Sequence, residues 1–278
     1  MKKTIKKITP KLVGFHLNSL FSFRPKNAVK RAFYLFCSPR NGKITPEQQV
    51  FLDSALREKI TVNNSEIQTY HWKGNKKTVL LVHGWESNAH RWKSLIEKLQ
   101  AKNYNIIALD APAHGNSSGL KFVVPEYASV LEKLIEKYHP EVMIGHSVGG
   151  MTVLYQQAKQ PIKDIKIVSL GAPSELTEIM NDYQHLLGLK PRLMKALENY
   201  FKERFGYNFH EFSSAIFVKN IKEKGLIIHD KLDKIVTVNN AELIHKNWKN
   251  AELMLTEGAG HSLYNDAINE KIIQFIEN

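Results

Sequence analysis

One serine of this 278-residue chain stands in a setting that serine nucleophiles require. Ser147 is the centre of Gly145-His146-Ser147-Val148-Gly149, which fits the pattern G-x-S-x-G. This pattern makes a sharp turn from a strand into a helix, where a side chain at either glycine would crowd the backbone. The turn exposes the serine hydroxyl at a helix N-terminus, whose free N–H groups favour negative charge. The motif therefore predicts nucleophilic attack by Ser147.

A serine hydroxyl needs a base, and the base needs a carboxylate that fixes its tautomer. His261 follows the last expected strand in a glycine-rich loop that can reach Ser147, so we predict that it is the base. Asp230 and Asp233 both follow the preceding expected strand. We favour Asp233 as the partner because it lies further out in the loop. Asp230 stays the second candidate, although its place beside the strand also suits a turn or capping residue.

The negative charge that forms on a carbonyl oxygen during such an attack needs backbone donors. The N–H of Val148 follows the nucleophile, and the loop after His83-Gly84 is expected to supply the N–H of Trp85 as the second donor. His83 has two interpretations: it takes part in catalysis, or it holds this loop by hydrogen bonds, which we favour. This chemistry requires no metal and no organic cofactor.

The elements that must position these residues alternate from Thr78 onward between short apolar runs and amphipathic helical patterns. Such an order predicts a mostly parallel sheet with helices on both faces, whose reactive groups gather at the carboxyl ends of the strands. The expected strands are Val79–Val82, Ile106–Leu109, Val142–Ile144, Ile165–Leu170, Leu226–Ile228 and Leu253–Leu255. The expected helices are Asn88–Ala101, Pro125–Tyr138, Val148–Ala158, Ala241–Lys246 and Ser262–Ile276.

Two regions lie outside this alternation. Before it we expect a helix over Pro46–Leu56, strands over Ile60–Val62 and Ile67–Trp72, and a hairpin turn at Gly74-Asn75. Between Gly171 and Gly225 the pattern is helical, which predicts a small helical lid inserted at about 174–222. Seven aromatic residues within 200–217 either line an apolar acyl pocket or anchor the lid. We therefore divide the chain into an N-terminal arm with a lead-in helix, 1–58, and a catalytic domain, 59–278.

The motifs together resemble those of the α/β-hydrolase superfamily, in particular its monoacylglycerol-lipase, serine-aminopeptidase and lysophospholipase-like group. They are His83-Gly84-Trp85, Asp110 through Ser117, the turn around Ser147, His229 through Asp233, and Gly258 through His261, over about residues 60–278. The resemblance implies the α/β-hydrolase fold and acyl transfer to water. Ala113 and Asp230 stand where the group usually or often has glycine, which leaves the substrate class open.

The net charge of +12 belongs almost entirely to the N-terminal arm. Residues 1–46 carry eleven Lys or Arg and no Asp or Glu, whereas the other 232 residues carry 28 basic and 27 acidic side chains. A nearly neutral body argues against a nucleic-acid enzyme. The arm either contacts an anionic membrane surface peripherally or is a lead-in that packs on the body.

The apolar runs are too short for a membrane span or a secretory signal, so we expect a cytoplasmic protein. Cys37, the single cysteine, is expected to be a small buried hydrophobe.

The sequence thus predicts a serine hydrolase that cleaves a small-molecule carboxylic ester or thioester with an apolar acyl group. Ser147, His261 and Asp233 form its catalytic triad. Two alternatives stay open: an acyltransferase on the same fold, and a binding module that has lost turnover. Reaction with a fluorophosphonate and product analysis with competing alcohols distinguish the three.

Overall fold

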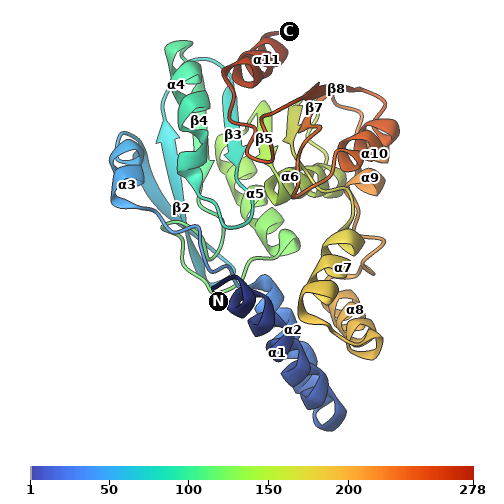
Figure 1. Cartoon of the computed structure of the whole chain (residues 1–278). Coiled ribbons are helices and arrows are strands. Elements are labelled where there is room, and N and C mark those ends of the chain that lie inside the picture. Colours follow the sequence, from blue (N-terminus) through green and yellow to red (C-terminus); the bar gives the residue numbers. More distant parts are fainter. Residues whose placement is uncertain (1) are drawn as a thin grey trace. The chain divides into compact units, whose positions relative to one another are not determined.

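The computed structural model describes the backbone of residues 2–278 and the side chains of residues 9–278. It consists of two compact units (Figure 1). One unit joins Met1–Ser38 to Glu175–Ser213, and the other joins Pro39–Ser174 to Ser214–Asn278. This division differs from the one expected from the sequence: residues 39–58 belong with the sheet, and the helices before them associate with the insertion.

The second unit is built on a sheet of eight strands in the order β1-β2-β4-β3-β5-β6-β7-β8. The strands from β3 to β8 run parallel, whereas β2 is antiparallel to both β1 and β4. Their bounds are β1 Leu56–Val62, β2 Ser65–Trp72, β3 Thr78–Val82, β4 Asn105–Leu109, β5 Val142–His146, β6 Lys166–Leu170, β7 Gly225–Asp230 and β8 Ala251–Thr256. This is the mostly parallel sheet that the alternating pattern predicts.

The hairpin lies elsewhere than predicted. The tight turn joins β1 to β2 at Asn63 and Asn64, whose φ angles are 49° and 63°. Two consecutive residues with positive φ are typical of a type I′ turn, and asparagine tolerates this conformation better than most residues. The prediction at Gly74-Asn75 was wrong, because β2 pairs with β4 and not with the strand that follows this segment.

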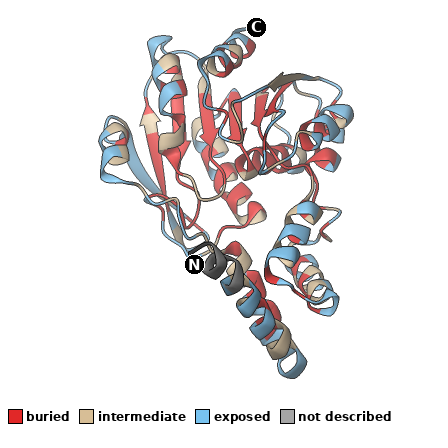
Figure 2. Ribbon diagram, viewed as in Figure 1, coloured by how far each residue is buried: buried red, intermediate tan, exposed pale blue. Residues whose placement is uncertain are grey.

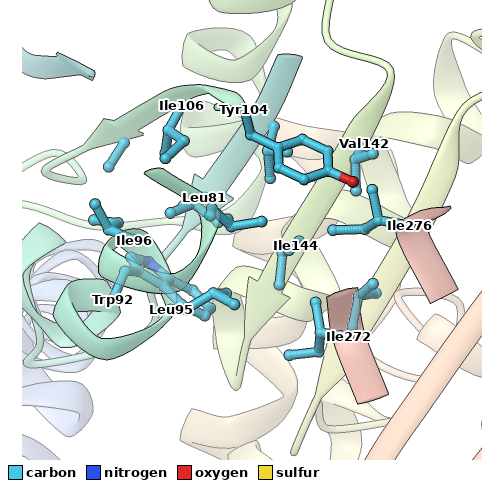
Figure 3. Packing of buried hydrophobic residues seen from close by; sticks show 14 of the residues in the cluster. Leu81, Trp92, Leu95, Ile96, Tyr104, Ile106, Val142, Ile144, Ile272 and Ile276 are labelled. Atoms are coloured by element: carbon cyan, nitrogen blue, oxygen red, sulfur yellow. The ribbon is translucent and has the colours of Figure 1, made fainter. Parts of the chain in front are cut away.

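Helices cover both faces of the sheet, and buried apolar side chains fill the space beneath them. On one face α4 (Lys93–Ala101) contacts β4, and α11 (Asp266–Glu277) contacts α4 and β7. Leu95, Ile144 and Ile272 belong to one continuous cluster beneath these helices (Figure 3). The helices α5 (Val124–Tyr138), α6 (Val148–Lys159), α9 (Ser214–Phe217) and α10 (Asn239–Asn247) lie on the other face. Figure 2 shows the central strands buried and the outer sides of α4 and α11 exposed.

Three helices of this unit are shorter than the sequence suggested. The α-helix α4 starts at Lys93, because the expected first turn is a 3-10 helix over Ala89–Trp92. The helix α3 covers Pro46–Leu52 and starts with a capping box, in which Thr45 and Gln48 bond to each other's backbone N–H. The last helix starts at Asp266 because the Asn265 side chain caps it by accepting a hydrogen bond from the N–H of Ala267. Residues 262–265 therefore stay in the loop after β8, next to His261.

The described residues of the first unit form four helices: α1 (Lys2–Phe23), α2 (Pro25–Cys37), α7 (Leu176–Leu187) and α8 (Pro191–Phe205). The two helices of the basic arm contact each other, α1 also contacts α7, and α2 also contacts α8. The arm and the insertion, which are far apart in the sequence, thus fold together. Among the described residues, no helix is both long enough and apolar enough to cross a bilayer.

Most of the aromatic residues expected in the insertion pack inside this first unit. The Phe201 ring lies 4.9 Å from that of Phe205 and 5.7 Å from that of Phe212, and Phe33 of α2 lies 5.2 Å from Tyr200. These contacts fix α8 on α2, which favours the anchoring interpretation over an acyl pocket. Cys37 at the end of α2 is buried, as the sequence suggested.

Candidate active site

Ser147 lies at a sharp turn between the end of β5 and the start of α6. Its φ is 54° and its ψ is −127°, a conformation that costs a non-glycine residue free energy and that clusters at functional sites. A Cβ on Gly145 would lie 2.6 Å from the Gly149 carbonyl oxygen, and one on Gly149 would lie 2.3 Å from that of Val82. Both positions therefore require glycine, which is the physical reason for the motif.

His261 and Asp233 lie in line with this serine. The His261 Nε2 atom is 3.0 Å from the Ser147 Oγ atom, and its Nδ1 atom is 2.7 Å from Asp233 Oδ2. Ser147 and Asp233 are buried, whereas His261 is partly exposed in the loop after β8. The arrangement allows a proton to pass from the serine to the imidazole while the carboxylate stabilises the resulting imidazolium.

The Asp233 carboxylate is held firmly on the side that faces away from the imidazole. Its Oδ1 atom accepts hydrogen bonds from the N–H groups of Ile235, at 2.8 Å, and Val236, at 3.0 Å. The side chain of His229 is fully buried beside it, with Nε2 3.4 Å from Oδ2 and donating to the carbonyl oxygen of Val236. Only Oδ2 is therefore directed at His261.

Asp230, the second candidate, serves the loops instead. Its Oδ1 accepts a hydrogen bond from the N–H of Leu232, and its Oδ2 accepts one each from the Thr256 hydroxyl and the N–H of Ala259. Burial raises the pKa of Asp230, but these donors outweigh burial and bring it below the ordinary value. The side chain thus ties the loop that carries His261 to the ends of β7 and β8.

Trp85 and Val148 lie on the two segments that meet at the serine. A Cβ on Gly84 would lie 2.8 Å from the carbonyl oxygen of His146 and 2.9 Å from Ser147 Cβ, so only glycine lets the loop after β3 approach this closely. Trp85 follows this glycine, and Val148 is the first residue of α6. That the backbone amides of these two residues form the oxyanion hole stays a prediction.

Two buried histidines hold the loops on this side of the site. The His83 Nε2 atom accepts a hydrogen bond from the N–H of Ala111, and its Nδ1 donates to the carbonyl oxygen of Gly84. The His114 Nε2 atom likewise accepts the N–H of Glu86, whose φ is 50°. Burial lowers the pKa of both rings, and that of His83 falls well below its ordinary value. The loop-holding interpretation of His83 agrees with these contacts.

Ala113 explains one departure from the superfamily pattern. Its φ is 67°, in the left-handed region that favours glycine, and it lies between the end of β4 and His114. The backbone at this position has the conformation that glycine adopts easily, although the residue is alanine. An alanine in this region costs roughly 1–2 kcal/mol, which the surrounding hydrogen bonds must offset.

Two side chains that sequence reasoning did not single out hold the loop of His261. The His146 Nε2–H donates to the carbonyl oxygen of His261 at 2.7 Å, and the Arg91 guanidinium donates to that of Ser262 at 2.9 Å. The His146 and His261 rings lie 5.0 Å apart. His146 lies inside the serine motif and Arg91 lies in no motif, but neither position indicates a contact with the loop of His261.

Similar proteins include bacterial esterases. A pimeloyl-[acyl-carrier protein] methyl ester esterase of Neisseria meningitidis serogroup B is 26% identical over 152 residues, which cover 54% of this chain and 57% of that protein. The protein of the same name from Pectobacterium atrosepticum is 24% identical over 175 residues, 60% of this chain and 65% of that protein. The chain therefore covers less than two thirds of either relative.

Solved structures share the fold at low identity. An esterase from Exiguobacterium antarcticum has a TM-score of 0.62 and 18% identity, covering 80% of this chain and 100% of that one. The mouse alpha/beta hydrolase domain-containing protein 10 has a TM-score of 0.63 and 16% identity, covering 80% of this chain and 97% of that one. The alpha/beta hydrolase fold family matches residues 77–219, just over half of the chain. This chain therefore belongs to the α/β hydrolase fold family.

Proposed function

We propose that the protein is a serine hydrolase that cleaves carboxylic esters or thioesters through a covalent acyl-enzyme. The observation that carries this proposal is the continuous contact from Ser147 Oγ to His261 Nε2 and from His261 Nδ1 to Asp233 Oδ2, at 3.0 and 2.7 Å. The nucleophile lies at the conformationally costly turn that the motif requires. The relatives named as esterases support the same class of reaction.

The reaction divides into two acyl transfers. The Ser147 hydroxyl attacks the carbonyl carbon while its proton passes to His261 Nε2, and the N–H groups of Trp85 and Val148 stabilise the oxyanion. The imidazolium then protonates the leaving alcohol or thiol, which departs and leaves an ester on Ser147. Water, deprotonated by the same imidazole, attacks this ester, releases the acid and restores the serine hydroxyl.

The preference for an apolar acyl group stays a prediction. The aromatic residues that suggested it pack mostly on one another and on α2, as described above. A series of p-nitrophenyl esters of increasing acyl length tests it directly. Rising kcat/KM from acetate to longer chains would support an apolar site, and a maximum at acetate would contradict it.

Labelling with a fluorophosphonate tests the nucleophile itself. We expect the wild-type protein to be labelled and Ser147→Ala to lose both the label and several orders of magnitude in kcat. Ser129→Ala, on the surface helix α5, is the control and should behave as wild type. Turnover by Ser147→Ala at the wild-type rate would refute the assignment. If the folded wild-type protein showed neither label nor turnover, it would be a binding module. Preferential transfer of the acyl group to an added alcohol would indicate an acyltransferase.

A further inference from the structure

The helix α1 carries large apolar side chains that are largely exposed among the described residues. Leu12, Phe15 and Phe23 are 62%, 72% and 85% exposed. At 100° per residue these three positions lie on one side of the helix, and we call them the α1 ridge. Single exposed apolar residues are ordinary on protein surfaces, but a row of three that includes two phenylalanines marks an interaction surface.

The orientation of α1 is fixed by its opposite face. A Cβ on Gly14 would lie 1.8 Å from the Leu187 carbonyl oxygen, so the α1 backbone touches the end of α7 directly. Leu17 is buried on the same face, and the Asn18 side chain donates to the carbonyl oxygen of Gly188 while accepting the N–H of Lys190. The helix cannot turn its ridge inward without breaking these contacts.

The segment that carries the α1 ridge is strictly basic in sequence. Residues 1–38 contain nine Lys or Arg and no Asp or Glu, whereas the insertion, residues 175–213, contains five basic and six acidic residues. The Arg31 side chain of α2 reaches back to α1, where its Nη1 atom is 3.5 Å from His16 Nε2. Arg24 and Lys26 are exposed directly after Phe23. Exposed phenylalanines thus lie within a strictly cationic part of the chain.

We propose that the α1 ridge docks on an anionic membrane surface, with its apolar side chains in the interface and the neighbouring cations on lipid headgroups. Aromatic and aliphatic side chains flanked by Lys and Arg are the combination that binds a helix in the plane of an anionic bilayer. The arm acts here as part of a folded four-helix unit and not as a loose tether. This inference is independent of the proposed esterase activity.

Co-sedimentation of the full chain with vesicles tests the proposal. The probes are vesicles of phosphatidylcholine alone and of phosphatidylcholine with phosphatidylglycerol, each at low and high salt. We expect binding only to the anionic vesicles, and weaker binding at high salt because the attraction is screened. Phe15→Ser with Phe23→Ser should weaken binding at least tenfold, and Lys26→Glu with Arg31→Glu should do the same. Val50→Ser, 75% exposed on α3, and Lys163→Glu with Lys249→Glu are the matched controls.

The results separate the proposal from its rivals. Weaker binding of both ridge and charge variants, with unchanged controls, supports docking on lipid. Equal sedimentation of the wild type and the double variant Phe15→Ser with Phe23→Ser would overturn it, as would equal binding to neutral and anionic vesicles. Light scattering is the second measurement: a wild-type dimer that the serine variant converts to a monomer, without vesicle binding by either, would show that the ridge joins two copies of the chain.

Discussion

Replacing Asp233 with asparagine tests the geometry of the site, because the hydrogen bonds around the carboxylate determine which way the new amide must point. Two backbone N–H groups, those of Ile235 and Val236, donate to Oδ1. An amide NH₂ in that position would meet two donors, so the amide oxygen must take it. The NH₂ group then occupies the place of Oδ2, 2.7 Å from His261 Nδ1, and donates to it. The imidazole is thereby forced to carry its proton on Nε2, opposite Ser147, where it cannot accept the serine proton.

The expected loss is large. A wrong imidazole tautomer in a serine protease triad lowers kcat about 10⁴-fold, which corresponds to about 5.5 kcal/mol of transition-state stabilisation at 1.36 kcal/mol per factor of ten. Steady-state kinetics on a soluble p-nitrophenyl ester measures it. We expect Asp233→Asn to reduce kcat by roughly this factor while the protein stays folded, because both backbone donors keep an acceptor.

Asp230→Asn is the matched control. It has the same change of chemistry three residues away, but its amide would oppose one of three donors: Leu232, Thr256 or Ala259. We expect a loss of about 1–3 kcal/mol in the free energy of unfolding and a change in kcat within about tenfold. Urea unfolding and the same ester assay separate the two effects. If Asp230→Asn lowered kcat as much as Asp233→Asn does, the assignment of the carboxylate would be refuted.

Three further predictions concern the supports of the site. Gly149→Ala places a Cβ 2.3 Å from the Val82 carbonyl oxygen and should lower the free energy of unfolding by about 1–3 kcal/mol or more in urea titrations. His146→Leu removes the donor to the His261 carbonyl oxygen and should lower kcat about 10- to 100-fold with little change in KM, since 1 Å of misplacement has effects of this size. Burial holds the pKa of His83 and His146 well below the ordinary value, so only the unfolded chain takes up these protons. The free energy of unfolding should therefore decrease as the pH drops below about 6.5, by about 1.4 kcal/mol per ring and pH unit. Equal urea midpoints at pH 7.5 and pH 5.5 would contradict this.

The sequence predicted the parts of the molecule that local rules determine. Continuous apolar runs separated by amphipathic helices lead to a parallel sheet because only burial on both faces suits such strands. The turn at Ser147 was predictable because the space beside Gly145 and Gly149 excludes a side chain. The preference for Asp233 over Asp230 as the partner of His261 rested on distance from the strand. In the structure Asp233 bonds to His261, whereas Asp230 accepts the N–H of Ala259.

Other features depend on contacts between distant residues and left no local signal. The hairpin at Asn63-Asn64 was missed because asparagine is a weaker turn signal than the Gly74-Asn75 pair, and only the pairing of β2 with β4 decides between them. The association of the basic arm with the insertion rests on the close approach of Gly14 to Leu187, more than 170 residues away. Charge alone predicted a basic arm but not a folded unit.

Several histidines lie near Ser147, and the hydrogen bonds around each ring determine which of them could act as a base. His83 and His114 each use Nε2 to accept a backbone N–H, so a proton on that atom would break an existing hydrogen bond. His146 uses its Nε2–H to hold the loop of His261, and burial lowers its pKa further. His261 differs because its Nδ1 faces a carboxylate and its Nε2 faces a hydroxyl. The three buried rings thus hold the surrounding loops, which leaves His261 as the base of the proposed mechanism.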